Sequence, residues 1–189
     1  MRIKFEKEKG FTIIELVVSI GIFALMTILL LAKYGNFNQG ILLTNLAYDV
    51  ALTIRNAQSY GLNVKSAVRD DDSFLYPYGV HFLSGANDFV FFADTNSDGS
   101  FLITTDMVLS KTTIQRGSKI SSLCVGSSDC MIQVNSLDIS FKRPDPNAII
   151  IADGSNASIY KYAEISLESS DGTIRKVIVR STGQISVEN

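Results

Sequence analysis

The sequence predicts an α+β protein in which one long N-terminal helix precedes an antiparallel β-sheet head. Three patterns support this fold class. Residues 11–32 form an apolar run of 22 residues with a single charge, helical periodicity follows between residues 42 and 61, and from Ala67 onward apolar positions alternate in short runs. The 189 residues, 46% of them hydrophobic, suffice for one modest domain and one membrane segment.

The apolar run is long enough to cross a bilayer, since 22 helical residues rise roughly 33 Å. A removed secretory signal would have a shorter apolar core, of about 7–15 residues, and a small-x-small cleavage site. This run instead ends in Leu30-Leu31-Ala32-Lys33. An ordinary transmembrane anchor explains the length but not Glu15, because an acidic residue inside lipid is costly and usually marks a function.

The residues around Gly10 favour a third interpretation. A basic stretch precedes Gly10, and Phe11-Thr12-x-x-Glu15 then opens the apolar helix. This arrangement resembles the leader and cleavage site of type IV pilins and type II secretion pseudopilins. The resemblance implies cleavage after Gly10 by a prepilin peptidase and methylation of the new N-terminus at Phe11. It also implies other pilin subunits, an inner-membrane assembly platform and its ATPase motor as partners.

Glu15 has a physical use in such a protein. Cleavage would leave a cation at the start of a helix that is buried against other subunits, and a carboxylate at the fifth mature position can neutralise that amine on a neighbour. Either charge alone would be heavily penalised in a low-dielectric bundle, so pairing selects the axial register of an incoming subunit. We therefore predict that Glu15 is an assembly residue.

The charges predict the orientation in the membrane. Residues 1–10 form the leader and carry four basic and two acidic side chains, a net of +2. The positive-inside bias would keep this leader in the cytoplasm, so the head would face the periplasm or the exterior from a single-pass position in the inner membrane. Without the leader, the net charge of −2 becomes −4, which argues against a general attraction to nucleic acid.

Residues 33–65 are expected to continue the helix. Gly35, Asn36, Asn38 and Gly40 weaken helix propensity and predict a bend or local melting over residues 33–40. Beyond them the pattern predicts an amphipathic helix that packs on its own sheet. Its apolar stripe is Leu42, Leu46, Val50, Ile54, Ala57 and Gly61, and its polar face is Thr44, Tyr48, Arg55 and Ser59.

Residues 66–189 are expected to form the β-rich head. The predicted strands are 79–83, 88–93, 101–109, 120–124, 131–134, 137–141, 148–152, 162–169, 173–180 and 184–187. Asp171-Gly172 predicts a hairpin with a type I′ turn. Pro144 and Pro146 predict a break between strands.

Three segments carry a narrower resemblance. They read LTNLAYDVALTIRNAQSYGLNV, FVFFADTNSDGSF and IRKVIVRSTGQISV, and they are similar to the GspH/FimT group of minor pseudopilins and minor pilins. The resemblance implies a pilin-like fold and a structural subunit that initiates or caps a pilus or pseudopilus. Two features depart from pilins in general: the apolar helix lacks proline, and the cysteines lie in the middle of the head.

The segment 94–99, Asp-Thr-Asn-Ser-Asp-Gly, is a candidate calcium loop. Asp94, Asn96 and Asp98 place oxygen-bearing side chains at alternate positions before a glycine, as calcium loops of the EF-hand type do. The twelfth position is Thr105 in place of a bidentate glutamate, which excludes a full EF-hand, although Asp106 could close a smaller site. The alternative is a polar turn between strands. Apart from calcium, the sequence predicts no cofactor.

Cys124 and Cys130 are separated by five residues that form a short flexible connection. On the outer side of the membrane such a pair favours a disulfide, and two buried free thiols are the alternative. Their spacing matches neither a C-x-x-C redox motif nor a zinc site.

The sequence shows no catalytic constellation, so we expect no enzyme. His81, the single histidine, falls in a predicted strand without an accompanying nucleophile motif. The basic residues Arg175, Lys176 and Arg180 could contact DNA phosphates, which leaves a DNA- or ligand-binding tip pilin of an uptake apparatus as the alternative function. A tethered, uncleaved domain with hydrolase activity is a third hypothesis, and the missing constellation argues against it.

Overall fold

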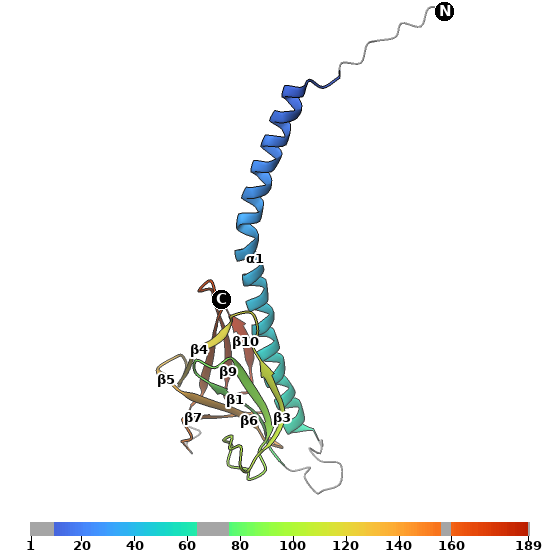
Figure 1. Ribbon diagram of the computed structural model, residues 1–189. Helices are drawn as coiled ribbons and strands as arrows, with labels where there is room; N and C mark the ends of the chain where they lie inside the picture. The colour runs from blue at the N-terminus through green and yellow to red at the C-terminus, as the bar shows by residue number, and fades with distance from the viewer. Residues whose placement is uncertain (1–9, 64–75, 156–159, 189) are drawn as a thin grey trace, which may run out of the picture. The chain divides into compact units, whose positions relative to one another are not determined.

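The computed structural model describes residues 10–63, 76–155 and 160–188, and it has the expected α+β organisation (Figure 1). The chain divides into two compact units, residues 1–38 and residues 39–189. The described residues contain one helix, α1 (Ile13–Leu62), and ten strands, all of which lie in the second unit.

Helix α1 passes from one unit into the other. Residues 33–40 are helical throughout, so the predicted local melting is wrong, although the boundary between the units falls in this segment, after Asn38. Glycine and asparagine lower helix propensity by less than about 1 kcal/mol each, which neighbouring helical turns can tolerate. The predicted bend stays a prediction.

The strands agree with the predicted ranges to within about two residues, with one exception. β3 begins at Met107 and not at Phe101, because the carboxylate of Asp106 accepts hydrogen bonds from the backbone of Thr95 and Leu102 and holds residues 101–106 as a loop. The strands are β1 (Tyr78–Leu83), β2 (Asp88–Ala93), β3 (Met107–Thr113), β4 (Lys119–Gly126), β5 (Ile132–Val134), β6 (Ser136–Phe141), β7 (Ala148–Ala152), β8 (Tyr162–Glu168), β9 (Ile174–Arg180) and β10 (Ile185–Glu188).

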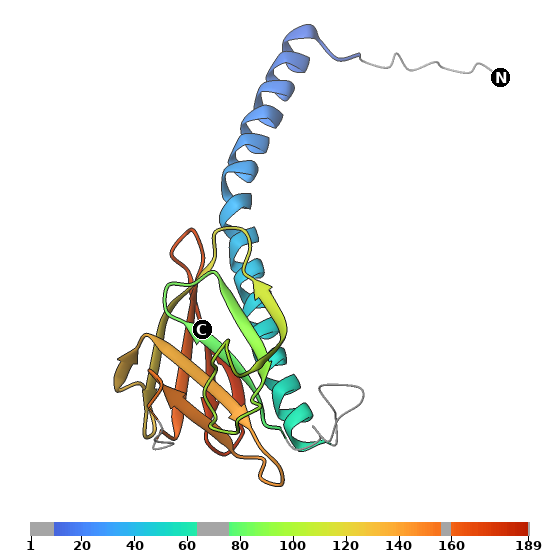
Figure 2. The same ribbon diagram turned by 60° about the horizontal axis from the view of Figure 1, so that its bottom comes forward.

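The head contains two antiparallel sheets where the sequence predicted one (Figure 2). Sheet A has the order β3-β2-β1-β6-β7, and sheet B has the order β10-β9-β8-β4-β5. The turn between β1 and β2 joins the sheets, because Gly85 N–H donates to the Ile120 carbonyl (2.8 Å) and Ile120 N–H donates to that of Ala86 (3.0 Å). Strand alternation alone cannot reveal such a division, since both sheets bury one face in the same core.

The second half of α1 shares that core with both sheets. Leu43 and Ala47 are fully buried in it, whereas Leu42 and Leu46, which the predicted stripe contained, are only half-buried. The stripe is therefore displaced by one residue in its first two turns. Thr44, predicted on the polar face, is half-buried and accepts a hydrogen bond from Arg175. The core members on α1 are Leu43, Ala47, Val50, Ala51, Ile54 and Ala57.

The hairpin at Asp171-Gly172 forms, but the predicted type I′ turn is wrong. Gly172 has a φ of 83°, while Asp171 is not among the residues with positive φ. Gly172 N–H donates to the Ser169 carbonyl (3.0 Å), and Ser169 N–H donates to that of Thr173 (3.0 Å). The connection is thus a three-residue loop in which a type I turn is followed by a left-handed glycine.

Candidate functional site

The peptide bond after Gly10 lies in the exposed chain immediately before α1. Gly10, Phe11 and Thr12 are exposed and outside the helix, and an added Cβ at Gly10 would meet no atom within 4 Å. Thr12 caps the helix, because its hydroxyl accepts a hydrogen bond from Glu15 N–H (3.3 Å) and its carbonyl accepts one from Leu16 N–H (3.1 Å). The bond predicted to be cut is therefore outside the rigid helix.

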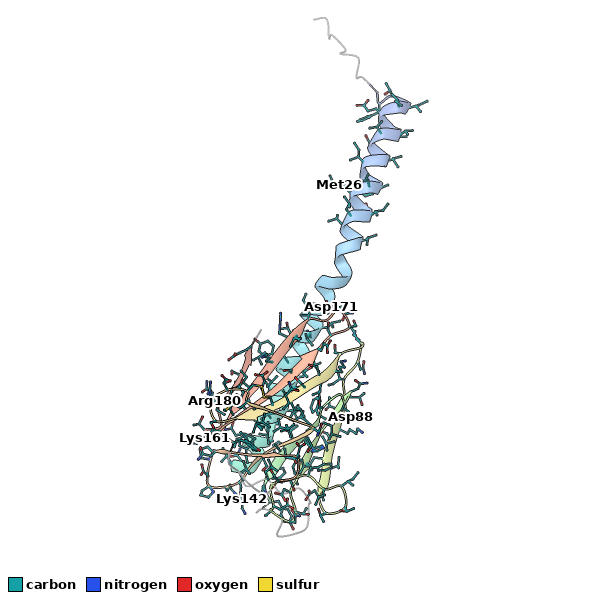
Figure 3. All side chains as sticks on the ribbon, turned by 90° about the vertical axis from the view of Figure 1, so that its left-hand side faces the viewer. Met26, Asp88, Lys142, Lys161, Asp171 and Arg180 are labelled. Carbon is teal, nitrogen blue, oxygen red and sulfur yellow. A yellow bond between two sulfur atoms is a disulfide. The ribbon has the colours of Figure 1, made fainter. Side chains whose placement is uncertain are left out.

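The first unit then continues as an apolar helix with no internal partner. Ile13–Leu31 forms a 19-residue segment with a mean hydropathy of 2.6 and no buried residue. Its side chains radiate to all sides of the helix, Met26 among them (Figure 3). The hydroxyls of Ser19 and Thr27 donate to the carbonyls of Glu15 (2.7 Å) and Phe23 (2.8 Å), which satisfies them within the helix. By length and composition the segment fits a membrane anchor.

Unlike the hydroxyl groups of Ser19 and Thr27, the carboxylate of Glu15 is not satisfied within the described part of the helix. It lies in the first turn of α1 and is exposed, and its carboxylate forms no hydrogen bond or ion pair in the described part of the chain. The first turn of a helix also has unpaired N–H groups and a partial positive charge, which favour an anion there. An unpaired carboxylate on an apolar helix requires a partner from outside this helix once water is excluded.

The comparisons identify this N-terminal region. A family model described as the prokaryotic N-terminal methylation motif matches residues 6–31. The match supports a type IV pilin-like protein, in which the motif implies processing by prepilin peptidase and assembly with other pilins. The apolar helix near the N-terminus fits a pilin membrane anchor. Comparisons with curated proteins and with solved structures found no match.

The candidate calcium loop joins β2 to β3. Asp94 is fully buried; its Oδ2 accepts a hydrogen bond from Gly99 N–H (2.8 Å), and its Oδ1 has no hydrogen-bond partner in the part of the chain that the structure describes. Burial raises the pKa of Asp94, backbone hydrogen bonds from Gly99 and Ser97 oppose this, and the charges of Asp106 and Asp98 raise it further. In the described residues, no three His, Cys, Asp or Glu side chains form a ready metal cluster.

Cys124 and Cys130 are joined by a disulfide, with their Cα atoms 5.4 Å apart. Cys124 belongs to β4, and Cys130 follows that strand just before β5. The bridge therefore closes the turn between two paired strands at one edge of sheet B. This position gives the disulfide a structural role.

The residues proposed for DNA contact do not form one patch. Neighbouring residues on a strand point to opposite faces, and Arg175 accordingly contacts Thr44 of α1 while Lys176 pairs with Glu164 (2.9 Å). Arg180 lies over the ring of Tyr162, 5.7 Å from its centroid. All three cations are thus engaged within the head, and DNA binding stays a prediction.

Two buried polar clusters escaped the sequence reasoning. His81 Nδ1 lies 2.6 Å from Asp138 Oδ1, with side chains 14% and 4% exposed. Burial raises the pKa of Asp138, and the contact with His81 lowers it by less. In sheet B, Glu164 accepts hydrogen bonds from Tyr162 and Ser166 besides pairing with Lys176. His81–Asp138 and Glu164–Lys176 each join two strands, so no local spacing revealed them, whereas Tyr162, Glu164 and Ser166 alternate along β8 and could have been found from the sequence.

Proposed function

We propose that this chain is a minor pseudopilin or minor pilin, made as an inner-membrane precursor and assembled into a type II secretion pseudopilus or a type IV pilus. Prepilin peptidase cuts after Gly10 and methylates the amine of Phe11. The observation that carries the proposal is Glu15, whose carboxylate has no partner among the described residues, on an unburied apolar helix that matches the methylation motif. The role is structural, since the motif is typical of structural subunits.

Assembly replaces lipid contact with protein contact along Ile13–Leu31. Lipid tails are as apolar as leucine, so this exchange yields little net hydrophobic free energy, and packing and polar pairing must provide the selectivity. Glu15 of one subunit pairs with the Phe11 amine of its neighbour. A polar pair at one depth sets the register between helices that apolar contacts alone would leave free to slide.

The processing step is tested by co-expressing the full chain with a prepilin peptidase and measuring intact mass. Wild-type protein should begin at Phe11 and carry one methyl group. Gly10→Arg should keep the full leader, because a long charged side chain replaces hydrogen at the cleaved bond. Gly21→Ala is the matched control, since Gly21 also lies in open space, and it should be processed normally. A wild-type product that retains Met1 would contradict the proposal.

A further inference from the structure

The loop between β2 and β3 contains a buried carboxylate oxygen that has no hydrogen-bond partner among the described residues. Asp94 is 0% exposed, and its Oδ1 is buried without a hydrogen-bond partner. Leaving a buried polar atom unpaired is unfavourable, and more so for a charged group. The Asp94 backbone is fixed as well, because its N–H donates to the Pro77 carbonyl (2.9 Å). A ligand from solvent would satisfy this oxygen.

Three side chains of this loop, Asp94, Asn96 and Asp98, have oxygen atoms that could bind a cation. Asp94 uses Oδ2 to accept from Gly99 N–H, and Asp98 uses Oδ1 to accept from Ser100 N–H (2.8 Å). The second oxygen of Asp98 accepts a hydrogen bond from the amide nitrogen of Asn96 (2.8 Å). The amide oxygen of Asn96 accepts a hydrogen bond from Asp98 N–H (3.3 Å). A rotation of the amide group that turned this oxygen toward an ion would replace both of these hydrogen bonds. Asp94 is thus held by one oxygen while the other can bind a ligand, and Asp98 Oδ2 can exchange its hydrogen bond from the exposed Asn96 side chain for an ion.

We propose that this loop binds one calcium ion, with Asp94 Oδ1 as its buried ligand and Asp98 Oδ2 and the Asn96 amide oxygen as further ligands. Asp106 positions the loop: its Oδ1 accepts from Thr95 N–H (3.1 Å) and its Oδ2 from Leu102 N–H (2.7 Å). Asn96, Ser97 and Asp98 are exposed, which gives the ion a route from solvent. The ligands are oxygen atoms only, as calcium prefers.

The expected affinity is modest. Two carboxylate ligands and no bidentate glutamate place the site near the extracellular calcium modules, whose dissociation constants are on the order of 10⁻⁴ to 10⁻³ M. Magnesium should bind less well, because it demands a near-ideal octahedron and gives up its water reluctantly. The inference is independent of the assembly role of Glu15.

The test uses the full chain in detergent, freed of metal with a chelator and then titrated with calcium chloride. Calorimetry should show one site per chain, and at a calcium concentration of about 100 times Kd the Tm should rise by about 5 °C. Asp94→Asn should reduce the calcium affinity at least about tenfold, because an amide nitrogen replaces one of the two carboxylate oxygens at nearly constant shape. Asp98→Asn, at an exposed position, should weaken binding without endangering the fold.

Asp145→Asn is the matched control. Asp145 also accepts a backbone hydrogen bond two residues along the chain, from Asn147 N–H (3.0 Å), but it lies in a different loop. This variant should bind calcium as the wild type does. Two results would overturn the proposal: no calcium binding by the wild-type chain at millimolar calcium, or unchanged binding by both Asp94→Asn and Asp98→Asn. The first would mean that Asp94 is kept as a neutral acid.

Discussion

Two glutamates in this chain occupy opposite environments. Glu164 lies in sheet B with its side chain 7% exposed, and Tyr162, Ser166 and Lys176 all contact its carboxylate. Glu15 lies on α1 in the first unit, exposed, and its carboxylate has no partner among the described residues. The head therefore satisfies the charge of Glu164 from its own strands, whereas the described part of the chain provides no partner for the carboxylate of Glu15.

The same contrast holds for apolar groups. In the head, the large core side chains of α1 and both sheets are buried together. Along Ile13–Leu31 none is buried within the chain. A segment of this length and hydropathy is long and apolar enough to cross a membrane. The head completes its own core, whereas the apolar part of the first unit fits a pilin membrane anchor.

The largest expected effect is that of Glu15→Gln on assembly. Removing the carboxylate leaves the neighbour's N-terminal amine buried and unpaired, which costs about 3–5 kcal/mol for a buried pair. Incorporation into filaments, measured by immunoblotting of sheared fibres, should fall more than about tenfold while processing and the head's Tm stay unchanged. Gly21→Ala in the same helix should assemble normally. Normal incorporation of Glu15→Gln would contradict the claim that the carboxylate of Glu15 pairs with a neighbouring subunit.

A second effect concerns the close approach of α1 to sheet A. A Cβ added at Gly61 would lie 2.9 Å from the carbonyl carbon of Phe141 and also meet its oxygen, so backbone must move. Gly61→Ala should destabilise the head by about 1–3 kcal/mol in chemical denaturation. Gly40→Ala, with open space around it, should instead be neutral or stabilising by up to about 1 kcal/mol. Equal effects at both sites would contradict the packing described here.

The smallest expected effect is the pH dependence contributed by Glu164. Burial raises its pKa, but the hydrogen bonds from Lys176 and Tyr162 outweigh this and hold the pKa below its usual value of 4.5. A lowered folded pKa gives stability that is present above pH 4.5 and is lost as the pH falls through the folded value.

Lys176→Met should therefore lower stability by about 1 kcal/mol at neutral pH, a modest amount because Lys176 is itself 40% exposed. This difference from wild type should shrink in acid, as measured by denaturation at several pH values. Lys111→Met, which removes the more exposed pair with Asp88, is the control and should have a smaller effect. A difference that grows as the pH falls would contradict the assignment.

Local patterns account for much of what the sequence could predict. Period-two alternation located nearly every strand, and Gly10, Phe11 and Glu15 were recognisable because their motif is contiguous. Three errors arose where distant residues decide. β3 starts late because Asp106 binds the backbone of Thr95, the helical stripe shifted because both sheets cover α1, and one predicted sheet proved to be two.

The partners of individual side chains could not be predicted from the sequence either, because they depend on contacts between residues that are distant in the sequence. His81 and Asp138 are 57 residues apart in the sequence and meet only because β1 pairs with β6. Arg175 and Lys176 are adjacent in the sequence, yet strand alternation sends them to different neighbours. The turn at Asp171-Gly172 had the right residues but one residue more in its loop than a type I′ hairpin has.

The most direct test of the account is a zero-length cross-link between subunits. Filaments assembled from a mixture of ¹⁴N- and ¹⁵N-labelled chains are treated with a hydrophobic carbodiimide, which condenses a carboxylate with a neighbouring amine. The account predicts a peptide in which Glu15 of one label is joined to the Phe11 amine of the other. Activated Glu15 that is never joined to Phe11 of another chain would contradict it.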